Sequence, residues 1–153
     1  VYHKNFETLD KDQDSTSIRT GEEAFSGTHY TYVSPQAPFR NGVVINVTEK
    51  MLDKKLFVNG CMYIKGHHPA TTETSMAISV EDSTGQVKYW TSKDLKFVSN
   101  YAEPDTWMPV TAEGVTPEMQ KGYRVKVFMW NVGQKDTLWI DDSYLQVIPA
   151  DGK

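Results

Sequence analysis

The chain has 153 residues, of which 39% are hydrophobic, 12% aromatic and 24% charged, and its formal net charge is −4. This length suits one domain with its own core, so we treat residues 1–153 as a single domain. The acidic balance argues against a protein that binds nucleic-acid backbones, and no apolar run reaches the ~18 residues of a membrane-spanning helix.

Apolar residues alternate with polar ones along most of the chain, which is the pattern of half-buried β-strands. Strands are predicted at 29–33, 43–47, 56–64, 76–80, 123–130 and 138–147, and short helical turns at 49–54 and 116–122. We therefore predict an all-β fold: a β-sandwich of two antiparallel sheets with eight to ten strands and at most one or two short helical turns. A single cysteine, Cys61, cannot supply the disulfide of an immunoglobulin domain, which favours a jelly roll.

The last predicted strand contains a change of parity. Leu138 and Ile140 occupy even positions, whereas Leu145 and Val147 occupy odd ones, so one extra residue must be absorbed between them. A β-bulge at residues 141–142 would do this and would place two aspartates inside an apolar strand.

Chain termini often lie close together, in which case Glu7 would meet this aspartate pair. Clustered carboxylates attract calcium, a hard cation that prefers oxygen ligands. The alternative is an ordinary solvated strand end that carries acidic residues.

Three segments together resemble a known family. The opening Asn-Phe-Glu at 5–7, the segment Gly-Glu-Glu-Ala-Phe-Ser-Gly-Thr-His-Tyr at 21–30 and the closing Ile-Asp-Asp at 140–142 resemble the jelly-roll carbohydrate-binding modules of families four, nine and twenty-two, within the galactose-binding-like fold. The resemblance spans residues 5–147. It implies one structural calcium ion that joins the first and last strands. The positions that match the family's metal ligands are Glu7, Glu22 or Glu23, Ser26 or Thr28, and Asp141 or Asp142.

Some predicted strands carry large side chains on the side that should face away from the core. Aromatic rings flanked by amides and cations suit sugars, because a ring covers the apolar face of a pyranose and the polar groups bond its hydroxyls. The candidate carbohydrate-binding residues are Phe57, Asn59, Tyr63, Trp90, Arg124, Phe128 and Trp130. The alternative is that these rings pack beneath loops or beneath a short helix.

No nucleophile, phosphate-binding or metalloprotease motif stands out, so we predict no catalytic residues. The resemblance implies a non-catalytic module that holds a larger secreted or cell-surface protein on a polysaccharide or oligosaccharide. Its expected partners are that glycan and other domains of a longer chain, without nucleic acid or membrane insertion. The alternative is a structural or protein-interaction domain of the same fold that binds no sugar.

Overall fold

The computed structural model describes residues 1–7, 18–20, 24–27, 29–66, 74–95, 105–131 and 137–150, with only the backbone described for 18–20. Within these ranges the strands are β1 (Tyr2–Lys4), β2 (Ile18–Thr20), β3 (His29–Val33), β4 (Phe39–Asn46), β5 (Leu56–Lys65), β6 (Thr74–Glu81), β7 (Val87–Asp94), β8 (Met108–Val115), β9 (Arg124–Asn131) and β10 (Leu138–Pro149). One 3-10 turn, η2 (Glu49–Met51), joins β4 to β5.

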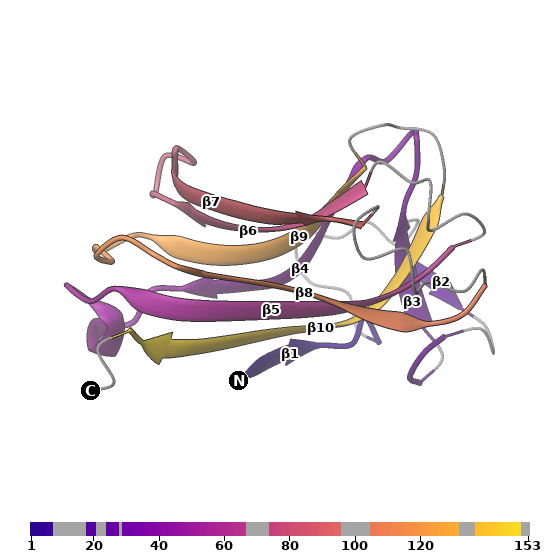
Figure 1. Ribbon diagram of the computed structural model, residues 1–153, viewed down its shortest axis with the longest axis horizontal. Coiled ribbons are helices and arrows are strands. Elements are labelled where there is room, and N and C mark those ends of the chain that lie inside the picture. The colour runs from indigo at the N-terminus through magenta and orange to yellow at the C-terminus, as the bar shows by residue number, and fades with distance from the viewer. Residues whose placement is uncertain are drawn as a thin grey trace.

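The strands form two antiparallel sheets that pack face to face (Figure 1). The six-stranded sheet has the order β2-β3-β10-β5-β8, with β1 also paired to β10, and the four-stranded sheet has the order β4-β9-β6-β7. The predicted all-β jelly-roll sandwich is confirmed, and the strands of the described ranges fall within the predicted eight to ten.

Alternation along the strands turns one side of each sheet toward a shared core. In β5 every second residue from Leu56 to Ile64 is buried and the residues between them are half-buried. In β9, Val125, Val127 and Met129 are buried and meet them from the other sheet. Each buried apolar side chain of this size contributes about 1.5–3 kcal/mol, so this two-layered core is the main source of stability.

One of the two predicted helical turns forms. The η2 turn confirms the first, but the segment after β8 is not helical. There the Met119 backbone N–H donates to the carbonyl of Lys54 at 2.9 Å, and the Thr116 hydroxyl accepts from the backbone N–H of Leu56 at 2.9 Å. Because Met119 is fully buried, packing against the chain before β5 replaces the local bonds of a helix.

The first and last strands are neighbours, as predicted. β1 pairs with β10 in the antiparallel sense, with Tyr2 opposite Leu145 and Lys4 opposite Ser143. The pairing of β10 with β5 shifts register between Asp141 and Ser143, so the bulge predicted from the parity change is confirmed.

A second bulge in β4 meets the bulge in β10. The register of β4 with β9 shifts between Asn41 and Val44, and there the backbone N–H of Val43 donates to the Ser143 hydroxyl at 3.1 Å. Gly42 lies so close to Ser143 that no side chain fits. The two bulges therefore join one sheet to the other beside the acidic segment of β10.

Candidate functional site

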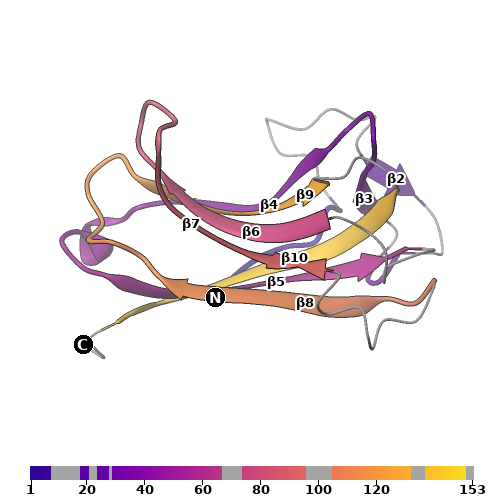
Figure 2. The same cartoon turned by 45° about the horizontal axis from the view of Figure 1, so that its top comes forward.

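The outer side of the four-stranded sheet gathers large and polar side chains. Figure 2 shows β6 curving along its length, with its hollow side turned away from the six-stranded sheet. Rows of facing residues cross this sheet, starting from β4: Phe39–Trp130–Ser75–Asp94, Asn41–Phe128–Ala77–Ser92, Val44–Lys126–Ser79–Trp90 and Asn46–Arg124–Glu81. These residues alternate with the core residues, so they lie together on one surface, which we call the hollow face.

Four aromatic rings on the hollow face contact one another. Phe39 stacks on Trp130, with ring centroids 5.7 Å apart and planes 9° apart. Trp90 meets both Trp130 and Phe128 edge-on, at 5.9 and 5.1 Å. Phe128 is buried beneath this group, whereas Phe39 is 55% exposed and Trp90 41% exposed. Two rings thus remain exposed to solvent, Phe39 on the edge strand β4 and Trp90 on the edge strand β7.

Charged groups lie at one end of the hollow face, where the Lys126 ammonium is 5.0 Å from the centroid of Phe128. The carboxylate of Glu81 accepts from Arg124 at 2.8 Å and contacts the Lys126 ammonium at 2.7 Å. Burial alone would raise the pKa of Glu81, but the bonds to Lys126 and Arg124 outweigh it and hold that pKa below its ordinary value. Glu81 is therefore ionised at neutral pH, and its carboxylate pairs with both Arg124 and Lys126.

Ser79 lies at the centre of the hollow face, between Lys126 and Trp90. Its side chain is 1% exposed, and its hydroxyl oxygen has no hydrogen-bond partner. A buried hydroxyl without a partner costs about 1–3 kcal/mol. The Ser79 hydroxyl is thus an unsatisfied polar group buried beneath the side chains of the hollow face.

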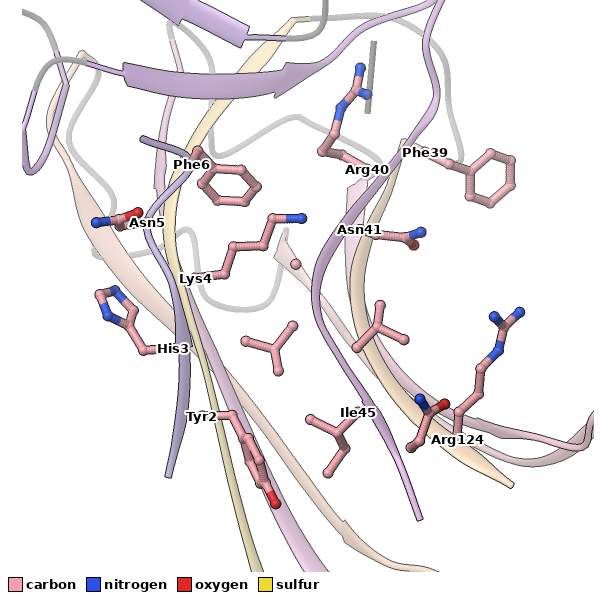
Figure 3. Close-up of a pocket in the computed structure, with 14 residues that line it drawn as sticks. Tyr2, His3, Lys4, Asn5, Phe6, Phe39, Arg40, Asn41, Ile45 and Arg124 are labelled. Atoms are coloured by element: carbon pink, nitrogen blue, oxygen red, sulfur yellow. The ribbon is translucent and has the colours of Figure 1, made fainter. Parts of the chain in front are cut away.

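A cleft of about 710 Å³ adjoins the hollow face, where β4 and β1 are the edge strands of their sheets. Lys4 reaches from β1 toward β4, whereas Asn41 and Arg124 lie on the other side of β4 (Figure 3). Phe39 also lines this cleft. The cleft and the hollow face therefore share the edge of β4.

The candidate sugar-binding residues do not share one surface. Trp90, Arg124, Phe128 and Trp130 lie on the hollow face, but Phe57, Asn59 and Tyr63 lie on the outer side of the other sheet. The strand pattern shows which residues point outward and not which sheet holds the strand, so these candidates divide between two surfaces. Phe39, Ser79 and Glu81, which complete the hollow face, were missed.

The outer side of the six-stranded sheet has its own aromatic contacts. Phe25 stacks on Tyr63, with centroids 3.9 Å apart, and Trp107 meets Phe25 edge-on at 6.2 Å. The Lys65 ammonium lies 5.2 Å from the centroid of Trp107. Phe25 therefore covers Tyr63, which agrees with the alternative that these aromatic rings pack beneath loops.

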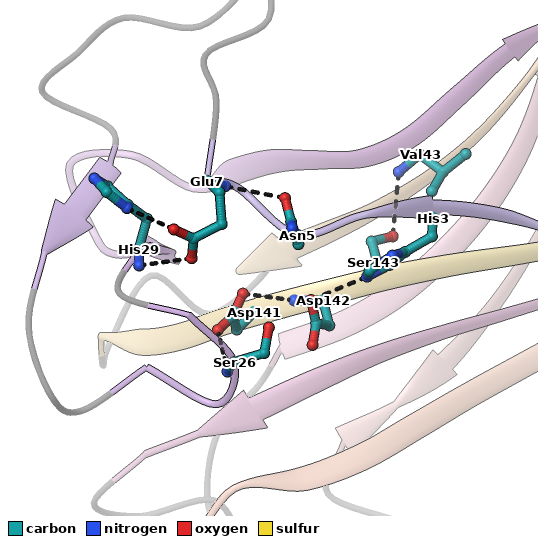
Figure 4. Close-up of polar contacts among 9 residues, drawn as sticks. All are labelled: His3, Asn5, Glu7, Ser26, His29, Val43, Asp141, Asp142 and Ser143. Carbon is teal, nitrogen blue, oxygen red and sulfur yellow. Dashed lines mark hydrogen bonds and ion pairs between the residues drawn. The ribbon is translucent and has the colours of Figure 1, made fainter.

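Glu7, which follows β1, contacts the turn before β3 (Figure 4). One Glu7 carboxylate oxygen accepts from the backbone N–H of His29 at 2.9 Å, and the other lies 2.8 Å from His29 Nδ1. Any side chain at Gly27 would collide with this carboxylate. Asn5 accepts from the Glu7 backbone N–H at 3.1 Å and so closes the turn that directs Glu7 here.

The aspartate pair of β10 approaches the same turn. Asp141 is fully buried, and its carboxylate accepts from the backbone N–H groups of Ser26 at 3.1 Å and Asp142 at 2.8 Å. Burial raises the pKa of Asp141 to about 6, against the opposing effect of these bonds. Asp142 has φ +43° and contacts His3 Nε2 at 3.0 Å. Both aspartates are buried, which excludes the alternative of a solvated strand end.

These residues do not by themselves fit a calcium ion. Among the described residues, no three His, Cys, Asp or Glu side chains lie close enough to hold a metal. The backbone N–H groups of His29 and Ser26 donate to the carboxylates of Glu7 and Asp141, whereas calcium needs six to eight oxygen ligands. Ser26 contributes its backbone N–H to Asp141. Glu22, Glu23 and Thr28 lie outside the described residues.

Chelation tests the calcium prediction directly. If a structural calcium ion joins the chain ends, EDTA should lower the melting temperature by about 5–10 °C, because an ion at 100 times its Kd adds about 2.7 kcal/mol. Excess CaCl₂ should restore the original value, and MgCl₂ serves as the control. An unchanged melting temperature would show that the hydrogen bonds of Glu7 and Asp141 hold the chain ends without calcium.

The fold has relatives among solved structures. The chain superposes on the CBM22-1 xylan-binding domain of Paenibacillus barcinonensis Xyn10C with a TM-score of 0.51 and 12% identity, over 97% of this chain and 94% of that one. It superposes on the arabinose-bound α-L-arabinofuranosidase MgGH51 with a TM-score of 0.51 and 9% identity, over 89% of this chain. The match spans only 22% of that enzyme's length.

The predicted resemblance to a jelly-roll carbohydrate-binding module is confirmed at the level of the fold. No protein-family model and no curated protein matches the sequence. A search of the described residues finds no helix with the length and hydropathy needed to span a membrane.

Proposed function

We propose that this chain is a non-catalytic carbohydrate-binding module whose hollow face binds a polysaccharide. The observation that carries the proposal is the group of four aromatic rings on that face, with Phe39 and Trp90 exposed near its two edges. Exposed rings cover the apolar faces of sugar rings, and a small number of polar groups then bond the hydroxyls.

The polar groups of the hollow face suit this role. Asn41 and Asn46 are exposed and present amides from β4, and the Lys126 ammonium lies 5.0 Å from the centroid of Phe128. The fold shared with a xylan-binding domain supports the same class of ligand and makes xylan the first glycan to test. In this proposal the module holds a larger secreted or cell-surface protein on its glycan.

Affinity electrophoresis through gels that contain soluble polysaccharides tests the proposal. The wild type should be retarded by at least one glycan, and Trp90→Ala should weaken binding about tenfold or more, as expected when an exposed aromatic contact with the sugar is lost. Because Trp90 is exposed, we expect this variant to keep its fold, and an unchanged melting temperature would verify that.

The variant Tyr63→Ala separates the two outer surfaces, because Tyr63 lies on the opposite sheet. We expect Tyr63→Ala to leave the retardation unchanged. If Tyr63→Ala abolishes retardation and Trp90→Ala does not, the hollow face is not the binding surface. If no glycan retards the wild type, a protein-interaction domain is the better explanation.

A further inference from the structure

The cleft at the edge of β4 differs in charge from the chain as a whole. The protein carries a net charge of −4, yet the cleft is lined by Lys4, Arg40 and Arg124 and by no aspartate or glutamate. Its volume of about 710 Å³ falls in the range of small-ligand sites. This combination of volume and charge favours an anionic ligand.

Arg124 is the residue best placed to contact such a ligand. Its Nε and Nη2 groups both donate to one oxygen of Glu81, at 3.0 and 2.8 Å, which uses two of the five N–H donors of the guanidinium. The Arg124 side chain is 45% exposed. Donors therefore remain on the solvent side, in the fork geometry that matches a carboxylate.

The charges around Arg124 do not cancel. Glu81 also contacts the Lys126 ammonium at 2.7 Å, so these three side chains together carry one net positive charge. Glu81 would keep Lys126 as a partner if Arg124 were replaced. A substitution at Arg124 is thus expected to change ligand binding without leaving a buried carboxylate unpaired.

Phe39 connects the cleft to the hollow face, since it lines the cleft and stacks on Trp130. Phe39 and Arg124 lie near opposite ends of β4, so a sugar chain that rests on Phe39 and follows this edge would bring a later unit, and not the adjacent one, to Arg124. We propose that the cleft recognises carboxylate-bearing sugar units, so that the natural ligand is an acidic polysaccharide that contains uronic acids. This inference rests on the proposed function and specifies the class of glycan.

A matched pair of ligands tests the inference. Trigalacturonic acid and α-1,4-galactotriose have the same ring stereochemistry and differ in the carboxylate at C6. By titration calorimetry, the wild type should bind the acid about tenfold or more tightly than the neutral sugar, as expected for a charge-assisted hydrogen bond. The preference should fall as salt rises, because the cleft is open to solvent.

Substitutions that remove single positive charges show which residues cause the preference for the acidic sugar. Arg124→Gln should remove the preference for the acid by weakening its binding much more than that of the neutral sugar, and Lys4→Gln should reduce the preference partly. Lys88→Gln is the matched control, since Lys88 is a cation on β7 that contacts Asp82 at 3.7 Å and lies outside the cleft. This control should bind both sugars as the wild type does.

The outcomes separate this inference from the proposed function. Equal binding of the two sugars, with loss of both in Trp90→Ala, would overturn the acidic specificity and leave the proposed function intact. Equal weakening of trigalacturonic acid and poly-L-glutamate by Arg124→Gln would also overturn it, because the cleft would then bind any polyanion. Binding of neither sugar would overturn the inference, and the glycan gels would decide the proposed function separately.

Discussion

Replacing Phe6 with alanine is expected to destabilise the fold by about 3–5 kcal/mol, the range for removal of a buried aromatic ring. Phe6 is 1% exposed and belongs to the core cluster, although its backbone has the left-handed φ of +62°. Burial of the ring is what compensates this unfavourable backbone conformation. The loss is a large share of the 5–15 kcal/mol of a typical domain, and the melting temperature should fall by about 10 °C.

Phe25→Ala is the matched control for this prediction. Phe25 is 41% exposed and its ring rests on Tyr63, so its removal should cost only about 1 kcal/mol. Urea denaturation followed by fluorescence measures both variants. If Phe6→Ala costs no more than Phe25→Ala, the Asn-Phe-Glu segment does not anchor the first strand in the core.

Gly42→Ala is expected to cost about 2–5 kcal/mol, because it combines overpacking with the loss of a buried hydrogen bond. The added Cβ would lie 2.7 Å from the Cβ of Ser143 and 2.9 Å from the terminal methyl of Met62. Ser143 could give way only by moving its hydroxyl from the backbone N–H of Val43, which would leave that group unsatisfied.

Gly85→Ala separates crowding from backbone strain. Gly85 has φ +86° and no atom within 4 Å of an added Cβ, so this variant should cost only the strain of about 1–2 kcal/mol. The free energies of unfolding of both variants come from urea titrations. A cost at Gly42 equal to that at Gly85 would mean that the two bulges do not pack as tightly as described.

The sequence predicted the fold well where the signal is local. Alternation along β5, β9 and β10 identified a two-sheet sandwich, because a strand buried on one side must alternate. The change of parity between Ile140 and Leu145 located the bulge to within a residue, since a strand cannot change its inward side without one. The helical turn after β8 was mispredicted because its backbone bonds to Lys54, a partner that is distant in sequence.

The candidate site was predicted only in part, for a reason that involves strand order. Parity identified Trp130 and Tyr63 as outward-facing, but whether they share a surface depends on which strands pair. Phe39 faces outward because the bulge after Asn41 reverses the parity of β4, and nothing in the local pattern reveals this. The Ser79 hydroxyl could be recognised as unsatisfied only from its surroundings in three dimensions.

The antiparallel pairing of β1 with β10 also determines how the domain would respond to mechanical tension. Tyr2 lies opposite Leu145, so the start of β1 and the end of β10 lie at the same end of this strand pair. Within a longer chain, a pull between the flanking segments would open the three residue pairs one after another, as a zipper opens, instead of shearing them together. Separation of β1 from β10 would meet its first large resistance at Phe6, because its ring must leave the core. Tension would then reach Glu7 and its hydrogen bond to His29.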